Sequence, residues 1–362
     1  MASSDNLKLR DRDAIVTRES LIFRVFGYTH PPEGYICDLE YAPQILFQSA
    51  NPKAYRTNGK HVFYKFYEDE GWRFISKHFP RYMILHKPLG RKVVGVHKED
   101  IAEIRRPEQA LKRILETKPK DELLKAVEKV LEATVLFLGL KIDHFGVFGS
   151  LLHGFYHPKF SDIDLIVYGR ENLEKIRNLL QELYKDGCSA FSNEFADASP
   201  IQGKVWRYKN LTPQEFVWHQ RRKLIYGVYR DETSGRTIKV EFEPVKSWNE
   251  IREDYGEIER ITWIGWIKAI LEVRDDSEAP YMPSVYQVEP LQILEGPRVN
   301  DLGMIVSYLE EFRMQAWRDE IIYVEGNLEK VETSNGSFCQ ITLTYGPRYY
   351  EQVLKVMKPI EI

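Results

Sequence analysis

Hydrophobic and polar positions follow two different periods along the chain, and the change between them suggests its organisation. Residues 21–41 contain the short runs LIFRVFGY and YICDLEY, separated by a Pro-Pro and Gly break. Alternation of this kind favours strands, and similar runs follow it. Residues 100–115, DIAEIRRPEQALKRIL, instead favour a helix or a helix-turn-helix. We therefore predict a strand-rich N-terminal module over residues 1–118.

The middle of the chain shows a helical period. After Pro119, apolar residues recur at the spacing of an amphipathic helix; they include Leu123, Leu124, Val127, Leu131 and Val135. HFGVFGS and SDIDLIVYG are predicted strands, with the helix RENLEKIRNLLQELYKDG after them. The sequence TPQE from Thr212 has the N-cap, N1 proline and capping-box acid of a further helix. The turn DETSGR then joins two predicted strands, and together these elements predict an α/β domain over residues 119–246, with helices packed on a short mixed sheet.

The last third predicts a helix and then more strands. Residues 247–282 favour a helical segment followed by a proline-punctuated linker. Residues 283–362 contain alternating runs around an Asn335-Gly336 pair, which is a strong hairpin signal. They predict a small C-terminal β domain resembling a barrel, for which an OB-like form is one candidate. The predicted fold class is α/β (α+β), with the central domain flanked by two strand-rich parts.

The most informative motif is Gly149-Ser150, then eleven intervening residues, then Asp162-Ile163-Asp164. Side chains alternate faces along a strand, so Asp162 and Asp164 point the same way, about 7 Å apart. Two like charges so placed repel each other. A divalent cation relieves this repulsion, and Mg²⁺ is commonly held by one or two carboxylates together with substrate phosphates.

The Gly-Ser pair is suited to holding a phosphate. Gly149 lets the backbone approach the phosphate without a Cβ in the way, and Ser150 can donate its hydroxyl to the same group. A turn of this kind also presents backbone N–H groups, which bind anions. The motif therefore predicts a phosphate-binding turn beside a pair of metal-binding carboxylates.

A third carboxylate is expected on the later strand TIKVEFEPV. Lys239, Glu241 and Glu243 share one face of this strand. Glu241, flanked by apolar residues, is the first candidate for a metal ligand and for the base that takes a proton from an acceptor hydroxyl. Glu243 is the alternative because it lies on the same face.

Over residues 120–246 these motifs resemble the polymerase-β nucleotidyltransferase superfamily. FGSLLHGFYHPKFSDIDLIVYG is similar to its first two elements, and VEFEP resembles the third-acid strand of its archaeal CCA-adding branch. The whole chain also resembles uncharacterised archaeal nucleotidyltransferases. The resemblance implies that Asp162, Asp164 and Glu241 hold two Mg²⁺ ions, for which Mn²⁺ is an alternative, and that Gly149 and Ser150 bind the triphosphate.

Two positions depart from the family pattern. Many members carry Arg before the spacer glycine, where this chain has His153, and the third acid is Glu rather than the commoner Asp. His153 is the remaining candidate for nucleotide binding, although a histidine is mostly neutral at pH 7. A Glu is one methylene longer than Asp, which relaxes the geometry of a metal ligand without preventing it.

The resemblance implies transfer of a nucleoside monophosphate from a nucleoside triphosphate to an acceptor hydroxyl, with release of pyrophosphate. The acceptor could be an RNA end, a protein or a small molecule. The competing hypothesis is a catalytically inactive fold that binds nucleic acid or assembles with partners. A small toxin-type transferase that modifies a partner protein is a third hypothesis, although this chain is much longer than those.

Charge bears on the choice of acceptor. The formal net charge is −3, yet residues 53–118 contain sixteen Lys and Arg against eight Asp and Glu. Such an excess suits a polyanion such as RNA, and a solvated charged face is the alternative. The N-terminus lacks the apolar core of a signal peptide and no apolar run is long enough to span a membrane, so we expect a cytoplasmic protein. The three cysteines are too far apart to suggest a metal site or a disulfide framework.

Overall fold

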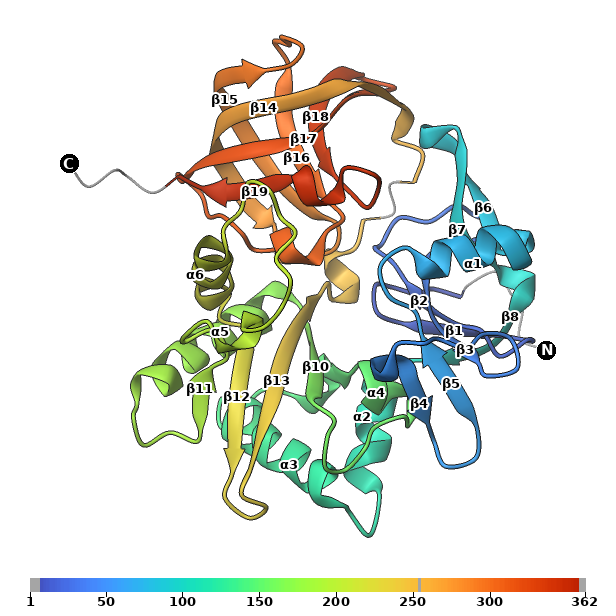
Figure 1. Ribbon diagram of the computed structural model, residues 1–362, viewed down its shortest axis with the longest axis vertical. Helices are drawn as coiled ribbons and strands as arrows, with labels where there is room; N and C mark the ends of the chain where they lie inside the picture. The colour runs from blue at the N-terminus through green and yellow to red at the C-terminus, as the bar shows by residue number, and fades with distance from the viewer. Residues whose placement is uncertain (1–6, 253–254, 358–362) are drawn as a thin grey trace. The chain divides into compact units, whose positions relative to one another are not determined.

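A computed structural model describes residues 7–252 and 255–357 and divides the chain into two compact units (Figure 1). Unit 1 comprises Met1–His86, Lys92–Asn193 and Leu224–Glu253, and unit 2 comprises Lys87–Arg91, Glu194–Lys223 and Asp254–Ile362. The N-terminal strands and the transferase-like sheet therefore belong to one unit.

The N-terminal part of unit 1 is a strand-rich module, as predicted. It has one α-helix, α1 (Glu70–His78). Its strands are β1 (Ala14–Thr17), β2 (Ile22–Val25), β3 (Gly34–Pro43), β4 (Tyr55–Thr57), β5 (Val62–Lys65), β6 (Met83–His86), β7 (Arg91–His97) and β8 (Ile101–Arg105). They pair in the order β4-β5-β3-β2-β1-β8, with β7 joined to β3 and β6. The core is formed by apolar side chains such as Ile15, Phe23 and Val96, all fully buried.

The prediction of a helix or helix-turn-helix over residues 100–115 was only half correct. Residues Ile101–Arg105 form β8, which pairs with β1, and helix α2 spans Pro107–Glu116. Pro107 sets this boundary because proline has no backbone N–H and fits the first position of a helix. The residue before it, Arg106, has extended backbone angles, as expected for a residue that precedes proline.

The second part of unit 1 is a five-stranded mixed sheet with helices. Its strands are β9 (Phe145–Val147), β10 (Ile163–Tyr168), β11 (Phe191–Asn193), β12 (Tyr226–Asp231) and β13 (Arg236–Val245), in the order β11-β12-β13-β10-β9. Only β10 and β13 pair in parallel. The accompanying helices are α2, α3 (Glu122–Leu131), α4 (Gly149–His153) and α5 (Arg170–Lys185). The strand, helix and hairpin predictions for this region are confirmed, and the mixed α/β class with them.

Unit 2 is built around a closed set of strands (Figure 1). They are β14 (Ile258–Glu278), β15 (Ser284–Glu295), β16 (Leu302–Ser307), β17 (Ile321–Thr333), β18 (Gly336–Leu343) and β19 (Val353–Val356). The order is β14-β15-β16-β18-β17-β19, and β14 also pairs with β17. This extra pairing closes five strands into a ring, so the barrel-like C-terminal fold is confirmed. Its OB-like character stays a prediction.

The helix predicted within residues 247–282 is wrong. Residues Ile258–Glu278 form the long strand β14, preceded by a short 3-10 turn at Trp248–Glu250. Within this strand Ile267, Ala269, Leu271 and Val273 are fully buried while the residues between them are partly exposed. That two-residue period is a strand period. Pairing with β15 on one side and β17 on the other overrides the helical tendency of the segment.

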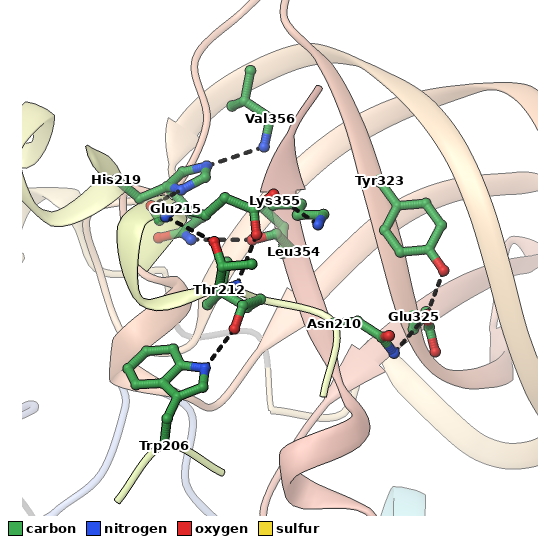
Figure 2. Close-up of polar contacts among 12 residues, drawn as sticks. Trp206, Asn210, Thr212, Glu215, His219, Tyr323, Glu325, Leu354, Lys355 and Val356 are labelled. Atoms are coloured by element: carbon green, nitrogen blue, oxygen red, sulfur yellow. Dashed lines mark hydrogen bonds and ion pairs between the residues drawn. The ribbon is translucent and has the colours of Figure 1, made fainter. Parts of the chain in front are cut away.

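Helix α6 (Pro213–Lys223) belongs to unit 2, although the predicted 119–246 domain includes it. Its N-terminus carries the predicted capping box, because Thr212 N donates to Glu215 Oε2 at 2.8 Å and Glu215 N donates to Thr212 Oγ1 at 3.2 Å. Figure 2 shows how the helix joins β19: Lys355 Nζ donates to Glu215 Oε1 at 2.8 Å, and Val356 N donates to His219 Nε2 at 3.1 Å. The segment before it is held in the same way, with Asn210 Nδ2 donating to Glu325 Oε1 at 2.9 Å. Among the described residues, no helix is long and apolar enough to cross a bilayer.

Candidate active site

Asp162 and Asp164 lie where the sequence predicts them, at the start of β10. Asp162 is exposed just before the strand, and Asp164 is partly buried within it. Burial, together with the neighbouring Asp162 carboxylate, raises the pKa of Asp164 to about 7. The ionised form of Asp164 is therefore costly in the free protein. A bound cation would remove this cost, which is the behaviour expected of a metal-binding pair.

Gly149 holds the predicted phosphate-binding turn directly against Asp164. Its φ of +58° is left-handed, and a Cβ at this position would lie 2.5 Å from Asp164 Oδ2. Phe148 N also donates to Asp164 O at 2.9 Å, which fixes the turn to β10. Glycine is thus required here both by conformation and by contact. The neighbouring Ser150 is partly buried, and its hydroxyl takes part in none of the hydrogen bonds found within the described ranges.

The parallel pairing of β10 and β13 places the third-acid candidates. Asp164 is level with Glu241 and Ile166 is level with Glu243, so both glutamates share the face of Asp164. Glu241 is partly buried. Glu243 is only 6% exposed and accepts a hydrogen bond from Arg12 Nη2 at 3.1 Å. The pairing places Glu241 level with Asp164, whereas Glu243 has a cationic partner and is the glutamate whose charge raises the pKa of Asp164. The choice between Glu241 and Glu243 as the third acid stays a prediction.

The fit of this site to Mg²⁺ rests on the two aspartates. In the described parts of the chain, no group of three His, Cys, Asp or Glu side chains is arranged to hold a metal ion. Glu241 therefore does not complete a preformed three-ligand cluster with the side chains as they stand. Two carboxylates are nevertheless a sufficient protein contribution for Mg²⁺, because substrate phosphates and water commonly supply its other ligands.

His153 lies in the contact between α4 and the N-terminal module. It is 6% exposed, with Nδ1 3.2 Å from Arg105 Nη1 and Nε2 3.8 Å from Glu40 Oε2. Its ring also packs edge-on against Tyr41, at 5.2 Å between ring centroids. Burial lowers the pKa of His153, so the ring is neutral at pH 7. This buried packing does not support a contact between His153 and the nucleotide. It suits a role of His153 in positioning α4.

The N-terminal module contributes two cations that the sequence did not single out for the site. Arg12 reaches Glu243, and it lies over the ring of Phe148, 5.0 Å from its centroid. Lys65, at the end of β5, acts on the carboxylates, since its charge lowers the pKa of Asp164. Both residues lie about a hundred positions or more from the aspartates in sequence. Only the basic excess of residues 53–118 hinted at such a contribution.

Comparison with known proteins agrees with this geometry. Residues 127–219 match the nucleotidyltransferase domain family. The match includes Gly149, Asp162 and Asp164 and ends before Glu241. An uncharacterised protein of Methanocaldococcus jannaschii, MJ1086, is 27% identical over 91% of this chain and 93% of its own length. The resemblance to the family and to an uncharacterised archaeal protein is therefore confirmed. No solved structure matches the chain.

Proposed function

We propose that this protein is an active nucleotidyltransferase that moves a nucleoside monophosphate from a nucleoside triphosphate to an acceptor hydroxyl. The observation that carries the proposal is the contact of the Gly149 turn with Asp164, beside the second carboxylate of Asp162. A phosphate-binding turn and a pair of metal-binding carboxylates then meet at one point. Charge stabilisation and positioning are the main sources of catalysis in phosphoryl-group transfer, and this arrangement supplies both.

In this proposal each side chain has one task. Asp162 and Asp164 would hold Mg²⁺, with Mn²⁺ as an alternative, and Glu241 is the proposed third ligand. When bound, a pair of such ions neutralises charge on the attacking and leaving oxygens of an in-line displacement. Gly149 and Ser150 bind the triphosphate through backbone N–H groups and the Ser150 hydroxyl. Lys65 offsets negative charge at the same place.

The reaction follows from these positions. The acceptor oxygen forms a bond to the α-phosphorus, and the bond from that phosphorus to the bridging oxygen breaks, so that pyrophosphate leaves. The hydroxyl proton passes to Glu241, which lies level with Asp164 across the sheet. A partly buried carboxylate can serve as such a base.

A second candidate function is an inactive transferase fold that binds a partner. It is favoured by one observation, namely that no three acids among the described residues form a ready metal site. Incubation of the protein with α-labelled nucleoside triphosphates and cell RNA or protein extract separates the two functions. We expect Mg²⁺-dependent labelling of one fraction by the unmodified protein, and its loss in Asp162→Asn with an unchanged melting temperature. If neither protein labels any fraction, the proposal of an active enzyme is wrong.

A further inference from the structure

A segment free of carboxylates borders the candidate site. Residues 51–67 contain Lys53, Arg56, Lys60 and Lys65 but no Asp or Glu. They form the 3-10 turn Pro52–Ala54, strand β4, a turn and strand β5. Within residues 7–252 and 255–357, none of these four cations takes part in an ion pair. We call residues 52–65, from this 3-10 turn to the end of β5, the β4–β5 hairpin.

One face of this hairpin is turned toward the transferase part of unit 1. In the hairpin Arg56 is level with Phe63, and side chains alternate along β5, so Arg56, Phe63 and Lys65 share a face. Phe63 packs against Phe155, which follows α4, at 4.8 Å between ring centroids. The face that carries Arg56 and Lys65 therefore approaches the helix that begins with the phosphate-binding turn.

Electrostatic effects agree with this placement. The charge of Lys65 lowers the pKa of Asp164, and the pKa of the buried Tyr41 responds both to Arg56 and to Asp164. Arg56 of the hairpin and Asp164 of the site therefore both affect the pKa of Tyr41. Lys60 is exposed in the turn between β4 and β5, and Lys53 is exposed in the 3-10 turn before β4, at the same end of the hairpin as Lys65.

The length of this row of charge indicates the kind of ligand. Lys60 lies in the turn before the extended β5, so Lys60 and Lys65 are at most roughly 17 Å apart. Proteins bind single strands with positively charged grooves that follow the phosphate backbone over several nucleotides, and a row of this length could face more than one phosphate. A nucleoside triphosphate offers only three adjacent phosphates, and the Gly149 turn already provides for them. The extra cations suit a longer polyanion.

We propose that the β4–β5 hairpin binds the phosphate backbone of a single nucleic-acid strand and holds the terminal hydroxyl of that strand beside Asp164. This inference rests on the proposed function for the identity of the reacting site, and it names the acceptor as a nucleic acid. Lys53, Arg56 and Lys60 contact successive phosphates. Lys65 lies closest to the carboxylates and contacts the phosphate next to the reacting end.

Binding of labelled 20-nucleotide RNA and DNA strands to the full chain, measured by fluorescence anisotropy without nucleoside triphosphate, tests the proposal independently of turnover. The test variant is Lys53→Gln/Arg56→Gln/Lys60→Gln. The control, Lys141→Gln/Lys175→Gln/Lys185→Gln, removes the same charge from exposed positions of unit 1 outside the hairpin. We expect the test variant to bind the strand at least about tenfold more weakly than the unmodified protein does. The slope of the logarithm of the binding constant against the logarithm of salt concentration should be smaller by about 2, since each single-strand phosphate contact contributes roughly 0.7. The control should stay within about twofold of the unmodified protein.

Three outcomes would overturn the proposal: no binding of either strand by the unmodified protein, equal effects of the test and control variants, or unchanged strand binding with a raised KM for nucleoside triphosphate. The last result would assign the cations to the triphosphate instead. The RNA and DNA arms show which backbone the hairpin prefers. If only the proposed enzymatic function is wrong, the strand still binds through the hairpin but no nucleotide is transferred to it. That result is distinct from the three outcomes above. Melting curves of both variants confirm that they fold.

Discussion

At the scale of single residues, Gly149 ties the phosphate-binding turn to the carboxylates. Glycine is favoured at this position for two separate reasons, its left-handed backbone and its close approach to Asp164. Gly154, at the other end of the same helix, has a similar φ of +68° but nothing within 4 Å of where a Cβ would lie. The two glycines therefore separate the effect of conformation from the effect of the Asp164 contact.

We expect Gly149→Ala and Gly154→Ala to cost a similar conformational energy, about 1–2 kcal/mol in the free energy of unfolding. Only Gly149→Ala should displace Asp164, and displacement by an ångström can lower turnover by about 10²-fold. Nucleotide-transfer rates and melting curves of the two variants measure this difference. Equal losses of turnover would show that the Asp164 contact has no part in the reaction.

His219 in unit 2 makes a second prediction at this scale. Its Nε2 accepts from Val356 N at 3.1 Å, and its Nδ1 lies 2.7 Å from Glu215 O, so the folded state needs a neutral ring that donates from Nδ1. Burial lowers the pKa of His219 to about 4, and the nearby charges of Lys223 and Arg222 act in the same direction. Protonation therefore favours the unfolded chain.

Because the unfolded pKa is about 6.5, this residue should reduce stability as the pH falls from about 6.5 toward 4, by about 3 kcal/mol at most. His219→Gln should flatten that part of the curve of unfolding free energy against pH. His30, whose pKa burial also lowers to about 4, contributes in the same range and stays in place as an internal reference. An unchanged slope in the variant would mean that His219 is already protonated in the folded protein.

Alternation along the sequence groups the proposed site residues that lie on or beside one strand, but it gives no sign of residues that come from elsewhere in the chain. Asp162 and Asp164 were predictable because a two-residue spacing fixes their common face. Glu241 and Glu243 stayed alternatives for the same reason, since alternation cannot separate two acids on one face. Arg12 and Lys65 reach the site only through packing of the N-terminal module, which no local pattern encodes.

At the scale of elements, β13 presents two acids with different surroundings. Glu241 lies level with Asp164, whereas Glu243 is nearly buried and paired with Arg12. We expect Glu241→Gln to lower nucleotide transfer by about 10²-fold or more with little change in stability. Glu243→Gln should instead cost about 2 kcal/mol in the free energy of unfolding, because the buried Arg12 loses one of its carboxylate partners and keeps Asp11, 3.5 Å from its Nε.

Transfer rates and denaturant unfolding of the two variants test this division of roles. Arg12→Met, alone and in the Glu243→Gln background, is the matched control, since the two changes together should cost less than the sum of their separate losses if the two side chains interact. If Glu243→Gln loses transfer without losing stability while Glu241→Gln stays active, then Glu243 is the acid of the reaction and Glu241 is not.

The mistaken helix over residues 247–282 has a physical cause at this same scale. The run IERITWIGWIKAILEV has apolar residues at both two- and four-residue intervals, so its pattern fits a strand or a buried helix. The choice is made by β15 and β17, which pair with β14 along its two edges. Such pairing depends on residues up to about 75 positions away, and local propensity cannot report it.

At the scale of the whole molecule, the N-terminal module belongs to the same compact unit as the transferase sheet. Phe63 against Phe155, Tyr41 against His153 and Arg12 against Glu243 join the two parts. The sequence predicted the α/β class, the strand-rich ends and most elements of the central domain. It could not predict this union, because side chains of both parts must meet before the contacts exist.

The central claim is that Asp162 and Asp164 support nucleotide transfer beside the Gly149 turn. Its most direct test is Mg²⁺-dependent transfer of α-labelled nucleotide by the full chain and by Asp162→Asn, with melting curves recorded for both. We expect transfer by the unmodified protein, a fall of about 10³-fold in the variant because charge stabilisation at the phosphate is lost, and equal melting temperatures. Undiminished transfer by Asp162→Asn would contradict the claim.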